Sequence, residues 1–274
     1  MKKPLFIISI DFELAWSFVN SGYVPPYIDN YCKKHNRVIQ EFLSLLNKYE
    51  IPVTWAIVGK SLLDKYKNNP LLYAKNTLYQ ILNAAMEHEI ASHSHSHIPF
   101  DRLSKNEARK DLELSKRVIV QVTGITPVTF IFPQSRIAHL KLLRELGFKV
   151  YRTRPNTILY KSQVLRILNK ILLRKPYLAK VVVNNDLIAI EYSLLLQEDF
   201  LLREPILSLW AENTLQQAIK RKAIFHMVLH DYGLCSKGVM GILNELLRKV
   251  SEFRHQNLIK VLRLRDLVSL FGVP

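Results

Sequence analysis

Short apolar runs alternate with amphipathic stretches along most of the chain. The first run begins at Pro4 and is almost continuously apolar, which is typical of a strand buried on both faces. Strands that alternate with helices form βαβ units, so the pattern predicts an α/β fold with a largely parallel sheet, either closed into a barrel or open and doubly wound. The helices predicted from apolar residues at three- and four-residue spacing cover residues 28–49, 61–67, 77–88, 104–123, 137–146, 161–174, 214–222 and 237–255.

The length and composition fit a single core. A chain of 274 residues with 49% apolar residues can bury a substantial core, and no linker or repeat divides it, so we expect one domain over residues 1–274. Two cysteines, Cys32 and Cys235, are too few for a disulfide framework and fit a reducing compartment. The first residues do not resemble a secretory signal, and no apolar run approaches the roughly 20 residues that span a bilayer. The sequence therefore predicts a cytoplasmic protein.

The formal net charge of +16 bears on the partners of the protein. Anionic saccharides, anionic membranes and nucleic acid would all be attracted, but the cations are dispersed and no nucleic-acid recognition motif is visible, so nucleic acid is not favoured. Residues 161–175 form a basic amphipathic pattern, which predicts either peripheral contact with the inner face of a membrane or an ordinary outer helix of the fold. Membrane contact would suit a lipid-linked substrate.

Two carboxylates, Asp11 and Glu13, follow the first apolar run. Residues two apart in a strand point the same way, so both side chains should leave the C-terminal end of this strand together. An unpaired charge at the end of a buried strand is costly. The pair therefore predicts a cationic partner, with a helix cap or a surface pair as the alternative.

Three histidines alternate with serines in Glu89-Ile-Ala-Ser-His-Ser-His-Ser-His97. Imidazole is the commonest protein ligand for divalent metals. His93 and His97 converge on one ion if the segment turns helically, whereas an extended strand would hold them roughly 13 Å apart at about 3.3 Å per residue. His95 cannot share that helical face. The segment predicts a metal site, and a polar surface loop rich in histidine is the alternative.

A further strand is predicted in Lys222-Ala-Ile-Phe-His-Met-Val-Leu-His-Asp231. The period of two places His226, Val228 and His230 on one face, with His230 at the C-terminal end, where a general acid would be useful. His226 lies deeper and is either a catalytic histidine or a hydrogen-bonded core histidine. Asp231 either orients His230 or begins the following turn.

These segments, in this order, resemble the polysaccharide deacetylases, the fourth family of carbohydrate esterases. The resemblance implies a distorted (β/α) barrel of about seven parallel strands, whose site lies at the C-terminal strand ends. The first motif has an Asp-x-Glu form in place of the commoner Asp-Asp pair, which resembles a subgroup of the family. The matching segments are Asp11-Phe12-Glu13-Leu14-Ala15-Trp16, Val53-Thr-Trp-Ala-Ile-Val-Gly59, His93-Ser94-His95-Ser96-His97, Phe130-Ile-Phe-Pro133 and Leu146-Gly-Phe-Lys-Val-Tyr-Arg152.

The resemblance implies hydrolysis of an N-acetyl group, or as second choice an N-formyl or O-acyl group, on a saccharide. One divalent ion would be held by Glu13, His93 and His97, with Zn²⁺ as the first choice and Co²⁺, Ni²⁺, Mn²⁺ or Fe²⁺ as others. Asp11 would act as general base and His230 as general acid. The opposite assignment, with Asp11 as ligand and Glu13 as base or bystander, stays open.

Two departures from the family pattern weaken the inference of activity. Ile131 stands where the family commonly has the arginine that orients the catalytic aspartate, and no match to the family's Asp-Trp motif is found. Arg136 and Arg152 are the candidates to replace that arginine, with a surface cation as the alternative for either. With Trp16 and His226 they complete the predicted substrate contacts. Trp16 either stacks on a sugar ring or packs against the rim of the barrel. A catalytically weakened or inactive glycan-binding protein on the same fold is therefore the alternative.

Overall fold

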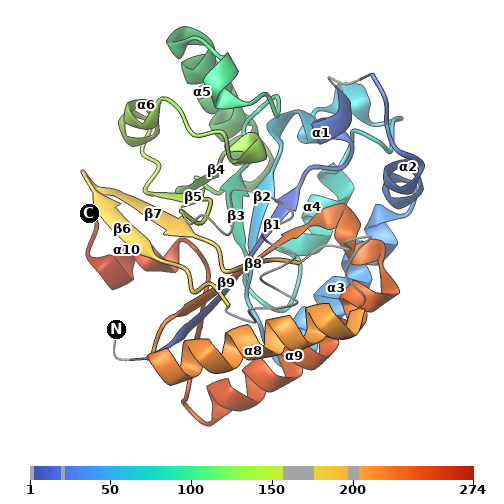
Figure 1. Cartoon of the computed structure of the whole chain (residues 1–274). Coiled ribbons are helices and arrows are strands. Elements are labelled where there is room, and N and C mark those ends of the chain that lie inside the picture. The colour runs from blue at the N-terminus through green and yellow to red at the C-terminus, as the bar shows by residue number, and fades with distance from the viewer. Residues whose placement is uncertain (1–2, 20–21, 157–175, 197–203) are drawn as a thin grey trace.

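The computed structural model describes residues 3–19, 22–156, 176–196 and 204–274 (Figure 1). The basic segment 161–175 lies outside the described residues, so the prediction of a helix and of membrane contact there stays a prediction. Among the helices that are described, none combines the length and the apolar character needed to cross a bilayer.

The described strands form one curled sheet in the order β6-β7-β5-β4-β3-β2-β1-β9-β8, with β10 also paired to β1 (Figure 1). The named strands pair in parallel except for the β6–β7 hairpin, which confirms the predicted α/β class and distorted barrel. The described residues form ten strands where about seven were expected. The strands are β1 (Leu5–Phe12), β2 (Thr54–Ile57), β3 (Glu89–Ser92), β4 (Thr129–Ile131), β5 (Val150–Thr153), β6 (Val181–Asn184), β7 (Leu187–Glu191), β8 (Leu194–Leu195), β9 (Ile224–His230) and β10 (Lys260–Leu262).

Strand β1 lies between β2 and β9 in the sheet and is buried along its whole length. Its alternate side chains face two different environments, as the pleat requires. Phe6, Ile8, Ile10 and Phe12 belong to the large core under the helices. The other face begins apolar, with Leu5 and Ile7 in a smaller core. It continues with Ser9 and Asp11, so this inner face becomes polar toward the C-terminal end of the strand.

Helices cover the outer face of the sheet, where α3 packs against α4 and α9, and α8 packs against α9 (Figure 1). Helix α5 begins with a capping box between Ser104 and Glu107, and ends at Gly124, whose φ of 71° suits glycine. The helices are α1 (Trp16–Val19), α2 (Pro26–Cys32), α3 (His35–Tyr49), α4 (Lys75–Leu82), α5 (Lys105–Thr123), α6 (Leu140–Glu145), α8 (Glu204–Arg221), α9 (Lys237–His255) and α10 (Asp266–Phe271).

Several predicted helix boundaries were wrong. The stretch 28–49 forms two helices, because the chain leaves helical geometry around Lys34. The stretch 61–67 falls in two short 3₁₀ turns. Helix α8 begins well before residue 214, since Pro205 is compatible with a first helical turn and an apolar stripe from Leu207 onward packs inward.

Candidate active site

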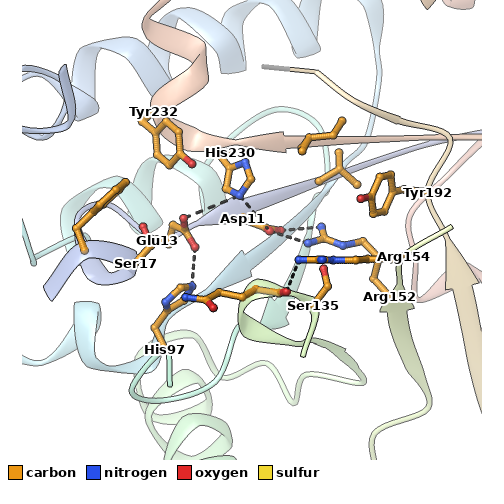
Figure 2. A pocket seen from close by; sticks show the side chains of 14 residues that line it. Asp11, Glu13, Ser17, His97, Ser135, Arg152, Arg154, Tyr192, His230 and Tyr232 are labelled. Carbon is orange, nitrogen blue, oxygen red and sulfur yellow. Dashed lines mark hydrogen bonds and ion pairs between the residues drawn. The ribbon is translucent and has the colours of Figure 1, made fainter. Parts of the chain in front are cut away.

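Acids and histidines from distant parts of the chain meet at the carboxyl ends of β1, β3 and β9 (Figure 2). Because β3, β2, β1 and β9 are neighbours in the sheet, their carboxyl ends share one edge. A cavity of about 470 Å³ opens there. Its lining is formed by Asp11, Glu13, Ser17, Phe18, His97, Gln134, Ser135, Arg152, Arg154, Tyr192, Leu195, Val228, His230 and Tyr232.

The His93–His97 segment is a tight loop that directly follows β3, so the helical turn expected from its spacing is wrong. The chain reverses through left-handed backbone at Ser94 (φ 65°) and His97 (φ 57°). The His97 amide donates to Ser94 Oγ at 2.8 Å, which closes the turn. The loop still brings the Nε2 atoms of His93 and His97 to 3.2 Å from each other.

Asp111 of α5 anchors this loop from behind. Its carboxylate accepts hydrogen bonds from the His95 amide at 2.7 Å and from the Ser96 amide at 3.0 Å. The Ser96 hydroxyl donates to the same carboxylate. Asp111 itself is only 7% exposed, so these bonds form in a nearly dry environment. His95 is not among the residues that could hold a metal together with His93 and His97, and its ring lies against Gly59.

Glu13, His93 and His97 can hold one metal ion. Their ligand atoms lie within 4.8 Å of one another, and Glu13 Oε2 lies 2.7 Å from His97 Nε2 and 3.2 Å from His93 Nε2. Tetrahedral zinc with bonds of about 2.0–2.1 Å would separate neighbouring ligand atoms by roughly 3.3 Å. The Ile131 carbonyl lies 2.9 Å from His93 Nδ1 and can only accept, so Nδ1 carries the proton and Nε2 is free to bind a metal. The residues present therefore fit the divalent ion that the family resemblance implies.

The same three side chains are strongly coupled. Burial opposes the charge on Glu13, but the neighbouring His97 and His93 outweigh it and hold the pKa of this carboxyl well below its usual value. Burial disfavours protonated His93, yet Asp11 and Glu13 raise its pKa overall. A proton on His93 competes with a metal for the same nitrogen, so we expect metal binding to weaken as the pH falls.

Asp11 is held by Arg152 rather than by an arginine on β4. The guanidinium donates to Asp11 Oδ1 at 2.7 Å and to Oδ2 at 2.6 Å, and both side chains are buried. Burial opposes ionisation of Asp11, but Arg152 and His93 outweigh it and lower its pKa. Arg152 on β5 is the direct register partner of Ile131 on β4, so the two side chains stand next to each other on the same face of the sheet. The neighbouring strand thus provides the charge that is absent at Ile131.

Arg136, the other candidate to replace the missing arginine, lies elsewhere. Its side chain is 57% exposed, forms an ion pair with Asp101 at 3.5 Å, and does not line the cavity. The expectation that Arg136 contacts substrate therefore gains no support from its position.

His226 is a core histidine, and its position gives no support to the substrate contact expected of it. The residue is fully buried and lies outside the cavity lining. Its Nδ1 donates to the Glu191 carbonyl at 2.9 Å, so Nε2 accepts from the Ser9 hydroxyl at 2.9 Å. Ser9 Oγ in turn accepts from Arg152 at 3.1 Å. This series of hydrogen bonds requires a neutral imidazole, and burial lowers the pKa of His226 to about 3. His226 therefore supports Arg152 from below.

His230 faces the two carboxylates from the end of β9. Its Nε2 lies 3.8 Å from Asp11 Oδ2 and 4.0 Å from Glu13 Oε1 (Figure 2). The ring stacks on Tyr232 with centroids 5.1 Å apart and an interplanar angle of 19°. The Nδ1 atom has no hydrogen-bond partner among the described residues.

Asp231 begins the turn after β9 and does not orient His230. Its carboxylate accepts hydrogen bonds from the Leu14 amide at 3.0 Å, from the Tyr31 hydroxyl at 3.1 Å and from the Tyr232 amide at 3.0 Å. It therefore ties the turn after β9 to the segment that follows β1, which keeps His230 beside the two acids.

Trp16 packs against the rim and does not line the cavity. It is 4% exposed, its Nε1 donates to the Leu72 carbonyl at 3.0 Å, and its ring meets Tyr66 edge to face. The residues that follow it reach the cavity instead. Sequence reasoning missed most of the cavity wall, since only the fold brings these positions together: Ser17, Phe18, Gln134, Ser135, Arg154, Tyr192, Leu195 and Tyr232.

Replacing Asp111 with alanine should loosen the histidine loop. The buried His95 amide and the part-buried Ser96 amide would lose their acceptor, at a cost of up to about 1–3 kcal/mol each in the free energy of unfolding. Loss of a supporting group behind metal ligands typically lowers metal affinity about 10- to 100-fold. Zinc titration and thermal unfolding measure both effects. Glu113→Ala, an exposed position on the same helix, is the matched control, and equal zinc affinity in the two variants would contradict the anchoring role.

The curled, mainly parallel sheet and the buried Glu-His-His cluster at its carboxyl edge define an α/β protein with a candidate metal site. Residues 25–151 match the family model described as polysaccharide deacetylase. This part of the chain is similar to the polysaccharide deacetylase family, which confirms the resemblance seen in the motifs. The Asp-x-Glu subgroup stays a prediction.

Solved structures share the fold at low sequence identity. One described as a polysaccharide deacetylase from Mycobacterium smegmatis is 16% identical, with 97% of this chain and 90% of that chain covered and a TM-score of 0.68. One from Pseudomonas aeruginosa PAO1 is 12% identical, with coverages of 97% and 89% and a TM-score of 0.69. A Puue allantoinase is 12% identical, with coverages of 97% and 89% and a TM-score of 0.67. No curated protein matches the chain.

Proposed function

We propose that the protein is a metal-dependent hydrolase that removes an N-acetyl group from a sugar in a glycan or in a lipid-linked glycan precursor. An N-formyl or O-acyl group is the second choice. The observation that carries the proposal is the convergence of Glu13, His93 and His97 beside the Asp11–Arg152 pair and His230. The match of residues 25–151 to the polysaccharide deacetylase family supports a hydrolase acting on acetylated saccharides.

A divalent ion held by Glu13, His93 and His97, with Zn²⁺ as first choice, would supply Lewis acidity toward the acyl oxygen and toward water. Asp11 is held ionised by Arg152 and faces the cavity, so its carboxylate can take a proton from the attacking water. Each carboxylate oxygen keeps a lone pair beyond the bond to Arg152. The bidentate pair fixes the direction in which Asp11 can accept that proton.

His230 can donate a proton to the departing amine. It lines the cavity, its side chain is 20% exposed, and Nε2 points toward the acids. The base and the acid thus lie on the same cavity, within reach of one scissile bond. In the opposite assignment, Glu13 would act as base and Asp11 as ligand; the bidentate engagement of Asp11 by Arg152 favours the first assignment.

The alternative is an inactive glycan-binding protein. The BA3943 protein of Bacillus anthracis, described as a pseudoenzyme, shares the fold with 16% identity, 97% of this chain and 66% of that chain covered, and a TM-score of 0.53. The fold therefore does not ensure activity. The feature that favoured inactivity here was Ile131 in place of an arginine. Arg152 on the neighbouring strand donates to Asp11, so the argument from Ile131 becomes weaker.

Metal removal combined with an acyl-release screen tests the proposal. Purified protein should contain a stoichiometric divalent ion, and N-acetylated saccharides or lipid-linked sugars should release acetate. A chelator should abolish release, and Zn²⁺ or Co²⁺ should restore it. Unchanged release from metal-free protein would contradict metal dependence. A metal-loaded protein that binds saccharide without releasing acetate or formate would favour the binding protein.

A further inference from the structure

Two arginines near the end of β5 reach the cavity, and they differ in what they contact. Arg152 is buried and its charge is neutralised by Asp11. Arg154 is exposed, and it makes no ion pair with a carboxylate among the described residues. One of its nitrogens donates to the Gln134 carbonyl at 2.6 Å. Arg154 therefore presents to the cavity a guanidinium that is held by Gln134 and that no carboxylate of the described residues neutralises.

The backbone beside Arg154 is shaped to support this position. Gln134 and Ser135 both have a φ of 53°, a left-handed conformation that costs roughly 1–2 kcal/mol for a residue with a side chain. This turn directs the Gln134 carbonyl to Arg154 and leaves Ser135 in the cavity lining next to it (Figure 2). A guanidinium and a hydroxyl thus share one side of the cavity, and both can donate hydrogen bonds.

The charges that line the cavity are unbalanced once an ion is bound. The guanidinium groups of Arg152 and Arg154 offset the carboxylates of Asp11 and Glu13. A divalent ion would then leave the cavity with net positive charge, which a neutral N-acylated sugar cannot offset. The net charge of +16 on the chain would also speed the approach of an anion.

We propose that Arg154, with the Ser135 hydroxyl, forms a subsite for an anionic group carried by the N-acylated saccharide. The group is a phosphate or a carboxylate, since the planar guanidinium matches both. This inference rests on the proposed function and narrows its substrate class. The subsite lies beside Arg152 and not at the Glu13–His93–His97 cluster, so it orients the sugar without entering the chemistry.

Calorimetry on the zinc-loaded protein tests the subsite without requiring turnover. The probes are neutral N-acetylglucosamine, its 1-phosphate, and N-acetylmuramic acid, which carries a carboxylate. The phosphate or the carboxylate saccharide should bind more tightly than the neutral one. Arg154→Gln should lower that affinity about 10- to 100-fold, the loss expected for charged hydrogen bonds, and change the neutral probe less than about twofold. The affinity of Arg154→Lys for the anionic probe should lie between those of the wild-type protein and of Arg154→Gln.

Arg136→Gln is the matched control, because Arg136 is an exposed arginine outside the cavity. Equal affinity of the wild-type protein for neutral and anionic probes would overturn the subsite, as would equal losses in the Arg154 and Arg136 variants. Acyl release from neutral sugars would then leave the proposed function intact. An anionic preference that depends on Arg154, without acyl release from any probe, would support the subsite and contradict the hydrolase. The better of the two anionic probes identifies the group as phosphate or carboxylate.

Discussion

Replacing Arg152 with isoleucine should abolish acyl release, and adding arginine at the neighbouring position 131 should restore part of it. The Arg152→Ile protein loses the bidentate partner of Asp11 and leaves a buried carboxylate unpaired, which typically costs about 3–5 kcal/mol. Ile131 stands beside Arg152 in the β4–β5 register and faces the same side of the sheet. The exchange I131R/R152I therefore moves the guanidinium by one strand and keeps the composition unchanged.

The pH dependence of kcat/KM separates a positioning role from a merely structural one. Arg152 lowers the pKa of Asp11, so its removal should raise that pKa. A base must be deprotonated to act, and the acidic limb of the profile should move to higher pH in Arg152→Ile. The exchange variant should move it back. A single variant with full activity, or an exchange variant that folds and binds zinc but regains no activity, would contradict the role given to Arg152.

Replacing His93 or His97 with alanine should remove metal binding and acyl release together. Each imidazole supplies one of three ligand atoms, so its loss should exceed the 10- to 100-fold decrease in affinity that is typical for groups behind the ligands. Metal content after dialysis, zinc calorimetry and acetate release measure the effect. Full activity in either variant would refute the ligand assignment.

His95→Ala is the control for these variants. His95 belongs to the same loop and is nearly as buried, but it is not among the ligand-capable residues, and Gly59 lies against its ring. We expect this variant to keep its metal and most of its activity. A loss of metal equal to that of His93→Ala would show that folding of the loop, and not ligation, explains the result.

Local patterns in the sequence predicted the parts of the site that lie within one element. The period of two along β1 placed Asp11 and Glu13 together, and the same period along β9 placed His230 at the strand end. The spacing of His93 and His97 predicted convergence only for a helical turn, and left-handed backbone at Ser94 and His97 brings the two rings together instead.

Interactions between elements could not be predicted from local patterns. That Arg152, and not Arg136, pairs with Asp11 depends on the register between β4 and β5, and no sequence motif encodes that register. His226 and Trp16 are polar or aromatic residues near functional motifs, and only their hydrogen bonds to the Glu191 and Leu72 carbonyls show that they pack inward. Most of the cavity wall comes from connections after the strands, where periodicity carries no information.

The side-by-side arrangement of Ile131 and Arg152 bears on how relatives of this protein are judged. An alignment compares residues position by position, and at position 131 this chain lacks the arginine that is common in the family. The lateral neighbour in the sheet offers the same guanidinium to the same carboxylate from another position. Whether a related protein can be active is therefore better judged from which cation lies next to the aspartate in its structure. A relative that lacks the arginine at one alignment position can carry it on the neighbouring strand.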